Sequence, residues 1–215
     1  MDKYAEILEL FGIEVPVGYS AEEIEKAKSE VGGLPSELEQ FYLNYGKSPE
    51  LHGLQDELIL PGQHKALLDK DYIIIFNENQ GVCQAGIKKS DAALPDPPVY
   101  TSVDDGEWKL SCPRVSDFLI AMFGYQASIC LEFSPEEFYF ITQEEKEKIE
   151  RLFKKCEQHF DNWLYDWNIT LYGDNNNGRI ALMDNGGDIQ MNYAANTEEE
   201  FIRMQKLLDG IGEPI

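Results

Sequence analysis

Hydrophobic residues in the first 45 positions recur at helical spacing. Tyr4, Ile7, Leu8 and Phe11 share one helical face. A second helix is expected from Ser20 to about Val31, because Ser20 with Glu23 matches a capping box and two glycines follow. A third helix is expected to open near Pro35 and to end at Gly46. The chain therefore begins with a helical segment.

From residue 58 the hydrophobic spacing changes to alternate positions, which predicts strands. These are expected at 58–60, 72–76, 82–87, 99–103 and 108–110. The polar segments 77–81 and 104–106 are typical of turns, and the second contains the Asp-Gly pair that hairpins favour. Consecutive strands joined by short turns indicate an antiparallel sheet. A helix from Ser116 to Phe123 is expected to follow.

The remainder of the chain shows the same kinds of pattern, a capped helix followed by strands and a final helix. Thr142 with Glu145 matches a second capping box, and the helix it opens is expected to continue to Trp163. The hydrophobic residues assigned to one face of that helix are Ile149, Leu152, Phe153, Cys156, Phe160 and Trp163. Strands are expected at 169–172, 179–183 and 189–193, and a last helix from Thr197 to Leu208. The sequence predicts an α+β fold, with residues 131–215 forming a helix–βββ–helix extension.

Segments 72–85 and 168–182 form a weak internal echo, each a strand, a polar turn and a second strand. A decayed duplication and two independent meanders both fit. Residues 1–130 are therefore expected to form one domain. Residues 131–215 are expected either to form a degenerate second unit or to complete the first.

Composition and charge narrow the classes of function. The 215 residues contain 43% hydrophobic residues, as in a globular protein, and 40 acidic against 18 basic residues, a net charge of −22. Such an acidic chain is not expected to bind nucleic acid or anionic membranes. The longest apolar run, Phe118–Phe123, is too short to span a bilayer, and the first residues lack a secretory pattern. With four cysteines and no CxxC pair, a reduced cytoplasmic protein is expected.

An ordered series of motifs in the first 125 residues resembles the SUKH superfamily. The series contains the helix start Leu34–Leu38, the helix end Phe41–Gly46, the strand Tyr72–Phe76 and the proline-rich approach Pro95–Tyr100. The acidic turn with Trp108 and the closing segment Val115–Leu119 complete it. The resemblance implies an antiparallel sheet packed with helices that binds proteins and lacks catalytic machinery. Most bacterial members are thought to be immunity proteins that protect a cell from a toxin, commonly a nuclease.

Neither catalytic nor metal-binding residues are expected. The histidines (His52, His64, His159) and the cysteines (Cys83, Cys112, Cys130, Cys156) carry no local nucleophile signature. Asp174–Gly178 resembles the opening of a calcium loop, but Arg179 occupies the position that requires glycine, and Asn185 replaces the final Glu. Asp184 and Asp188 could add carboxylate ligands if the two turns met, which would give at most weak binding of an adventitious ion. No phosphate-binding glycine motif is present in the sequence, and no cofactor is expected.

Acidic hairpin tips are the predicted binding site. Asp104, Asp105 and Glu107 cluster on a turn where no helix dipole favours acids, beside Trp108 as an aromatic anchor or a core residue. Glu78 and Asp174 occupy two other turns. The sequence predicts an immunity protein whose acidic surface binds a basic surface of a cognate toxin. The alternatives are a regulatory or scaffold interaction module, and an enzyme acting on a small cationic or polar substrate.

Overall fold

A computed structural model describes residues 2–64, 69–174 and 176–215. Asn175, part of the predicted Asn-rich turn, lies outside the described residues. The chain divides into two compact units that are discontinuous in sequence. The N-terminal unit holds the described residues of Ile13–Leu119 and Asn162–Leu164, and the C-terminal unit those of Met1–Gly12, Ile120–Asp161 and Tyr165–Ile215. The sequence analysis placed its boundary after residue 130 instead.

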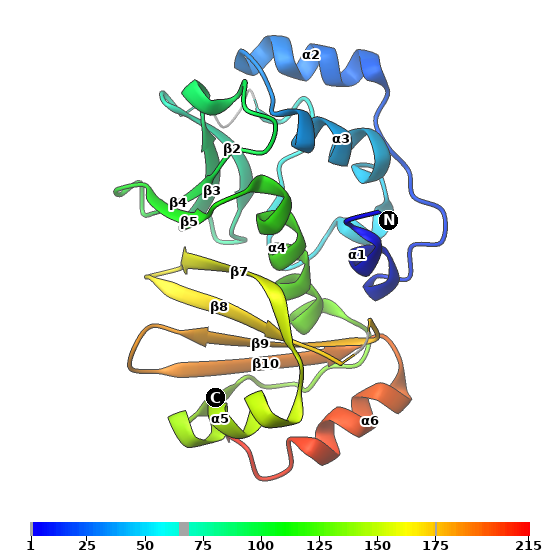
Figure 1. Cartoon of the computed structure of the whole chain (residues 1–215), viewed down its shortest axis with the longest axis vertical. Coiled ribbons are helices and arrows are strands. Elements are labelled where there is room, and N and C mark those ends of the chain that lie inside the picture. The colour runs from blue at the N-terminus through cyan, green and yellow to red at the C-terminus, as the bar shows by residue number, and fades with distance from the viewer. Residues whose placement is uncertain (1, 65–68, 175) are drawn as a thin grey trace. The chain divides into compact units, whose positions relative to one another are not determined.

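Two helices open the N-terminal unit (Figure 1). In α2, Ala21–Val31, the Ser20 hydroxyl accepts from the Glu23 N–H while the Glu23 carboxylate accepts from the Ser20 N–H, which confirms the capping box. Gly32 ends α2 at a φ of 84°. Helix α3, Ser36–Tyr45, follows Pro35 and buries Leu38, Phe41, Tyr42 and Tyr45.

An antiparallel sheet forms the rest of the N-terminal unit. Among the described residues its five strands lie in chain order: β1 Glu57–Leu58, β2 Tyr72–Asn77, β3 Cys83–Lys88, β4 Val99–Val103 and β5 Lys109–Cys112. Short 3₁₀ turns, η1 Pro49–Leu51 and η3 Lys89–Asp91, lie in the connections. This arrangement confirms the antiparallel meander expected from the alternating pattern.

Aromatic residues join the sheet to its helices. Phe76 of β2 contacts Phe118 in the first turns of α4, Val115–Cys130, edge to face, with ring centroids 6.3 Å apart. The Tyr42 hydroxyl donates to the Ile59 carbonyl, and His64 lies beside it with Nδ1 2.9 Å from the Ile74 carbonyl. Helix α4 is longer than predicted, since the expected end at Phe123 lies in its middle.

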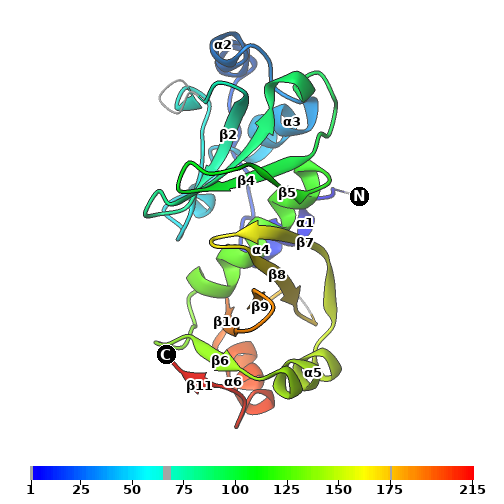
Figure 2. The same ribbon diagram turned by 90° about the vertical axis from the view of Figure 1, so that its left-hand side faces the viewer.

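The C-terminal unit is built on a second antiparallel sheet (Figure 2). Its six strands in the described part of the chain have the order β11-β6-β10-β9-β8-β7. Their bounds are β6 Tyr139–Ile141, β7 Lys155–Trp163, β8 Trp167–Tyr172, β9 Gly178–Asp184, β10 Ile189–Ala195 and β11 Glu213–Pro214. The helices are α1 Ala5–Leu10, α5 Gln143–Leu152, α6 Glu198–Leu207 and the part of α4 from Ile120 onward.

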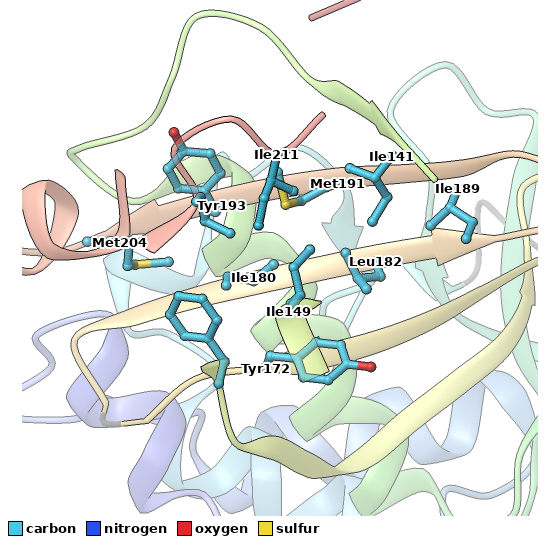
Figure 3. Close-up of a cluster of buried hydrophobic side chains, with 13 residues drawn as sticks. Ile141, Ile149, Tyr172, Ile180, Leu182, Ile189, Met191, Tyr193, Met204 and Ile211 are labelled. Atoms are coloured by element: carbon cyan, nitrogen blue, oxygen red, sulfur yellow. The ribbon is translucent and has the colours of Figure 1, made fainter. Parts of the chain in front are cut away.

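Both faces of this sheet are covered within the unit. On one face Ile149 of α5, Met204 of α6 and Leu208, which directly follows α6, contribute to a hydrophobic core (Figure 3). The sheet residues of that core include Ile141, Tyr172, Ile180, Leu182, Ile189, Met191 and Tyr193. On the opposite face Leu10 of α1 and Ala127 of α4 pack with Ala194 of β10. Burial on both faces explains why residues 180–183 of β9 are continuously apolar.

The helix predicted over 142–163 is wrong in its second half. The Thr142–Glu145 capping box is present and α5 begins as expected, but the backbone becomes extended at Phe153, with φ −129° and ψ 146°. Residues 155–163 form β7, which pairs with β8. Cys156 and Phe160 are four residues apart, a spacing that fits a helix face and also one face of a strand, so the hydrophobic pattern could not decide. Pairing with β8 decides it.

The structure confirms the α+β class, with antiparallel sheets in both units. None of the helices in the described ranges combines the length and the apolar character that crossing a bilayer requires.

Candidate functional site

Two turns lie together at one end of the five-stranded sheet. The β2–β3 turn and the β4–β5 turn are neighbours because Cys83 of β3 pairs with Val103 of β4. The Asp104 N–H donates to the Val82 carbonyl at 2.8 Å, which links the turns directly. Antiparallel pairing thus brings the β2–β3 turn, which contains Glu78, next to the Asp104–Trp108 segment.

Left-handed backbone defines the β4–β5 turn. Asp104 and Asp105 have φ of 50° and 55°, the pair of positive values typical of a type I′ hairpin turn. The Gly106 N–H closes the turn on the Val103 carbonyl at 2.8 Å. The two left-handed positions of the turn are therefore Asp104 and Asp105, one residue earlier than the predicted Asp105-Gly106 pair. Asp tolerates this conformation better than most residues with a side chain.

The carboxylates of this turn point into solvent. Asp104, Asp105 and Glu107 are all exposed, and we call these three residues the acidic tip. Among the described residues, no hydrogen bond or ion pair engages their carboxylates. Three like charges held on a short turn, without a compensating cation, are electrostatically unfavourable in the isolated protein. A cationic partner would relieve that repulsion.

Glu78 lies beside the acidic tip but turns inward. Its side chain is 7% exposed, and Oε2 accepts from the N–H groups of Gln80 at 3.0 Å and Val82 at 3.2 Å. Asp56 is also buried and accepts from the Asn79 N–H at 3.3 Å. These two acids organise the β2–β3 turn, so their lone pairs are used within the fold rather than offered to a partner.

Trp108 is half-buried on one face of the sheet. Its indole stacks on the Tyr72 ring, with centroids 4.0 Å apart and planes 12° apart, and Tyr72 meets Tyr100 at 5.8 Å. Gly86 makes room for the indole, because a Cβ there would lie 3.1 Å from Trp108 Cη2. We call Tyr72, Tyr100 and Trp108 the aromatic platform. Lys88 covers one edge of it, with Nζ 4.3 Å from the Tyr100 centroid.

Sequence reasoning identified Trp108 but missed the two tyrosines. Tyr72 faces Lys88 across β2 and β3, and Tyr100 faces Gly86 across β3 and β4, so these positions share one face of the sheet. Each residue is only partly buried at its strand position. A local signal existed in β4, where Tyr100 lies between the buried residues Val99 and Thr101, but not in β2, where Tyr72 begins a continuous apolar run. The strand register that brings the two tyrosines onto one face could not be predicted from the sequence.

Asp174, the remaining predicted site residue, belongs to the C-terminal unit. Its carboxylate accepts from the Lys154 N–H at 3.0 Å through Oδ1, and from Arg203 at 3.0 Å through Oδ2. Asp184 of the neighbouring turn is similarly bound by Lys146 at 2.6 Å. Both carboxylates have protein partners, so the loop that resembles a calcium site is held by cationic side chains and backbone.

Of the histidines and cysteines considered for catalysis, Cys83, Cys112 and His64 are buried, whereas Cys130 and His159 are exposed. Desolvation raises the pKa of Cys83 to about 12 and that of Cys156 to about 11, so neither thiol is activated as a thiolate. Burial lowers the pKa of His64, whose ring is 2% exposed. Within the described ranges, no three His, Cys, Asp or Glu side chains are arranged to hold a metal ion.

Comparison with known proteins adds no relative. The chain matches no protein-family model, no curated protein and no solved structure.

Proposed function

We propose that this chain is an immunity protein that binds a cognate protein toxin and neutralises it through the acidic tip. The observation that carries the proposal is the exposed, uncompensated tip (Asp104, Asp105, Glu107) beside the half-buried Trp108. The resemblance of residues 1–125 to the SUKH superfamily supports the class of function. The fold class agrees with that resemblance, and the toxin-binding role rests on the surface.

Charge favours a basic partner. The protein carries a net charge of −22, and a nuclease toxin must be basic around its phosphate-binding groove. Opposite potentials can raise an association rate by one to three decades, and the effect weakens as salt is added. The acidic tip is narrow, because Asp104 and Asp105 form a two-residue hairpin turn that Glu107 follows closely, and a narrow tip suits a groove.

The aromatic platform supplies the apolar part of such an interface. Trp and Tyr are enriched among the residues that dominate binding energies, because they bury a large area at little conformational cost. Trp108 is held in place by Tyr72 and by the close approach to Gly86. A platform ordered before binding lowers the entropy that the complex must lose. An arginine of the partner could stack on these rings while it faces the acidic tip.

A growth assay tests the proposal. The protein encoded beside this gene would be expressed alone and together with this chain. Arrest by the neighbour and rescue by co-expression are expected. The variant D104N/D105N/E107Q, which removes three charges, should lose rescue. The control E132Q/E136Q/E137Q removes three exposed acids of the other unit and should retain it.

Two results would contradict the proposal. If expression of the neighbouring protein did not arrest growth, that protein would not be a toxin and the proposal would lose its partner. If the chain captured only regulatory proteins, the scaffold alternative would be favoured. Rescue by both variants would remove the acidic tip from the interface while leaving the immunity function standing.

A further inference from the structure

An exposed apolar surface lies at one edge of the six-stranded sheet, in the C-terminal unit (Figure 2). Strand β11 ends the sheet there and pairs with β6, so that Glu213 lies opposite Phe140. The Ile215 N–H donates to the Phe138 carbonyl at 2.9 Å, which continues this pairing past the two-residue strand. We call Phe138, Phe140 and Ile215 the apolar edge. Their exposed fractions are 43%, 44% and 55%.

The alternation of side chains along β6 explains this exposure. Tyr139 and Ile141 pack into the core that the sheet shares with α5 and α6, so Phe138 and Phe140 point to the opposite face. On that face α1 and α4 pack against β10 at Ala194, but Phe140 on the next strand stays exposed. Single exposed hydrophobic residues are ordinary on a protein surface, whereas adjoining ones form the kind of patch that marks an interaction site.

Residues outside the patch hold this edge of the sheet in place. The Gly212 N–H donates to Glu145 Oε1 at 3.0 Å, and the same carboxylate caps α5 by accepting from the Thr142 N–H. Gly212 has a φ of 83°, and a Cβ there would lie 2.9 Å from the Tyr139 Cβ, so this close approach requires glycine. The apolar edge is therefore presented by a fixed backbone, which lowers the entropy lost on binding.

A partner strand is a poor fit for this edge. Strand β11 has only two residues, and the second, Pro214, has no N–H to donate. A further strand added beside β11 would therefore form few backbone hydrogen bonds. The face that carries the apolar side chains is the better contact, and the apolar stripe of an amphipathic helix suits such a face.

The charged residues that flank the apolar edge in the chain are acidic. Glu136, Glu137 and Glu213 are exposed, and within the described ranges no hydrogen bond or ion pair engages their carboxylates. Strands β6, β10 and β11 contain neither lysine nor arginine. Two copies of this chain would bring like charges together at this surface, whereas a basic partner would neutralise them.

We propose that the apolar edge docks a basic amphipathic helix of a second protein. The apolar stripe of that helix covers Phe138 and Phe140, and its lysines or arginines face Glu136, Glu137 and Glu213. The opposite charges set the orientation of the helix, while the apolar contact supplies most of the affinity. This surface and the acidic tip belong to different units, so the proposal does not depend on the toxin contact.

Titration of the ¹⁵N-labelled full chain with a helical peptide that carries leucines on one face and lysines on the other tests this surface. The salt concentration is about 0.15 M, so that distant charges are screened. Saturable shifts are expected at the amides of Phe138, Phe140 and Ile215. The variant F138A/F140A should bind the peptide at least tenfold more weakly, because two half-exposed rings supply much of the buried area.

The matched control is L152A/I202A, which removes two apolar side chains of similar exposure, 41% each, from α5 and α6 of the same unit. Its affinity for the peptide should stay within about twofold of the original protein. Equal weakening by the two alanine pairs would overturn the proposal, because any exposed apolar residue would then serve.

A second pair of variants, of equal net charge, tests the acidic residues and stays informative if F138A/F140A folds poorly. The variant E136Q/E137Q/E213Q should bind the peptide about fivefold more weakly, the effect expected of three exposed charges. The variant D104N/D105N/E107Q should stay within about twofold of the original protein. Equal weakening by these two variants would overturn the proposal, because net charge would then explain binding.

Two other results would also overturn it. A peptide whose leucines are replaced by glutamines should bind far more weakly, so equal affinity for both peptides would remove the apolar contact. Self-association of the chain that F138A/F140A abolishes, measured by sedimentation, would make the apolar edge a contact between copies instead.

Discussion

The conformation of the acidic tip makes a sharp prediction about which substitutions the turn accepts. Asp104 and Asp105 have φ of 50° and 55°. An alanine in left-handed backbone loses roughly 1 kcal/mol, whereas Asn tolerates that region nearly as well as Asp. The pair D104A/D105A should therefore lose about 2 kcal/mol of unfolding free energy. The pair D104N/D105N should stay within about 0.5 kcal/mol of the original protein, because no hydrogen bond or ion pair within the described part of the chain engages the replaced carboxylates.

Thermal and urea melts followed by circular dichroism measure this difference. For a chain of this size, about 2 kcal/mol corresponds to a fall in Tm of roughly 4–8 °C. An alanine pair that melts with the original protein would refute the assignment of left-handed backbone to this turn. An asparagine pair as unstable as the alanine pair would show that the carboxylates hold the turn. The outcome decides whether Asn and Gln variants separate binding from folding.

Two further predictions concern stability. Burial lowers the pKa of His64, so the imidazole binds a proton more readily in the unfolded chain than in the folded one. The unfolding free energy should therefore have its full value above about pH 6.5. Below that pH it should decrease, by at most ~1.4 kcal/mol per pH unit. Urea melts at pH 7.5 and 5.5 check this, and an equal slope in His64→Gln would contradict it. Arg203 bridges Glu200 at 2.8 Å and Asp174 at 3.0 Å with its side chain 39% exposed, so Arg203→Gln should lose only about 0.5–1 kcal/mol. The loss should shrink in 0.5 M NaCl, and a salt-independent loss would exclude an electrostatic origin.

Local signals in the sequence predicted most of the fold. Both predicted capping boxes are present, at Ser20 and at Thr142, because each depends on residues three apart in the chain. The antiparallel meanders follow from alternating strands and short polar turns in the same way. The segment 155–163 was mispredicted because its hydrophobic spacing satisfies two periods, and only pairing with a later strand separates them.

Only part of the candidate site could be predicted from the sequence. Exposed acids on a hairpin turn were predicted, since nothing local could bind Asp104 or Asp105. The inward orientation of Glu78 was not predicted, because the sequence does not show whether a carboxylate accepts hydrogen bonds from the backbone N–H groups of its own turn. The stacking of Trp108 on Tyr72 depends on strand register and on the space above Gly86. These are long-range properties.

The pocket of about 380 Å³ beside Arg179 in the C-terminal unit could not be predicted from the sequence. Glu6 and Arg179 are 173 positions apart, yet they pair within the C-terminal unit. Lys154 and Lys155 were assigned to a helix, where they would not have faced the end of β8. Their place at the pocket follows from the change to extended backbone at Phe153. A wrong secondary structure over the nine residues of β7 was therefore enough to hide the pocket.

The association rate of the chain with its toxin tests the central claim most directly. Stopped-flow mixing at low and high salt would compare D104N/D105N/E107Q with E132Q/E136Q/E137Q, two variants of equal net charge. We predict that the tip variant associates at least tenfold more slowly at low salt and loses most of its salt dependence, while the control stays close to the original protein. Equal rates for the two variants would contradict the account, because net charge alone would then steer the encounter.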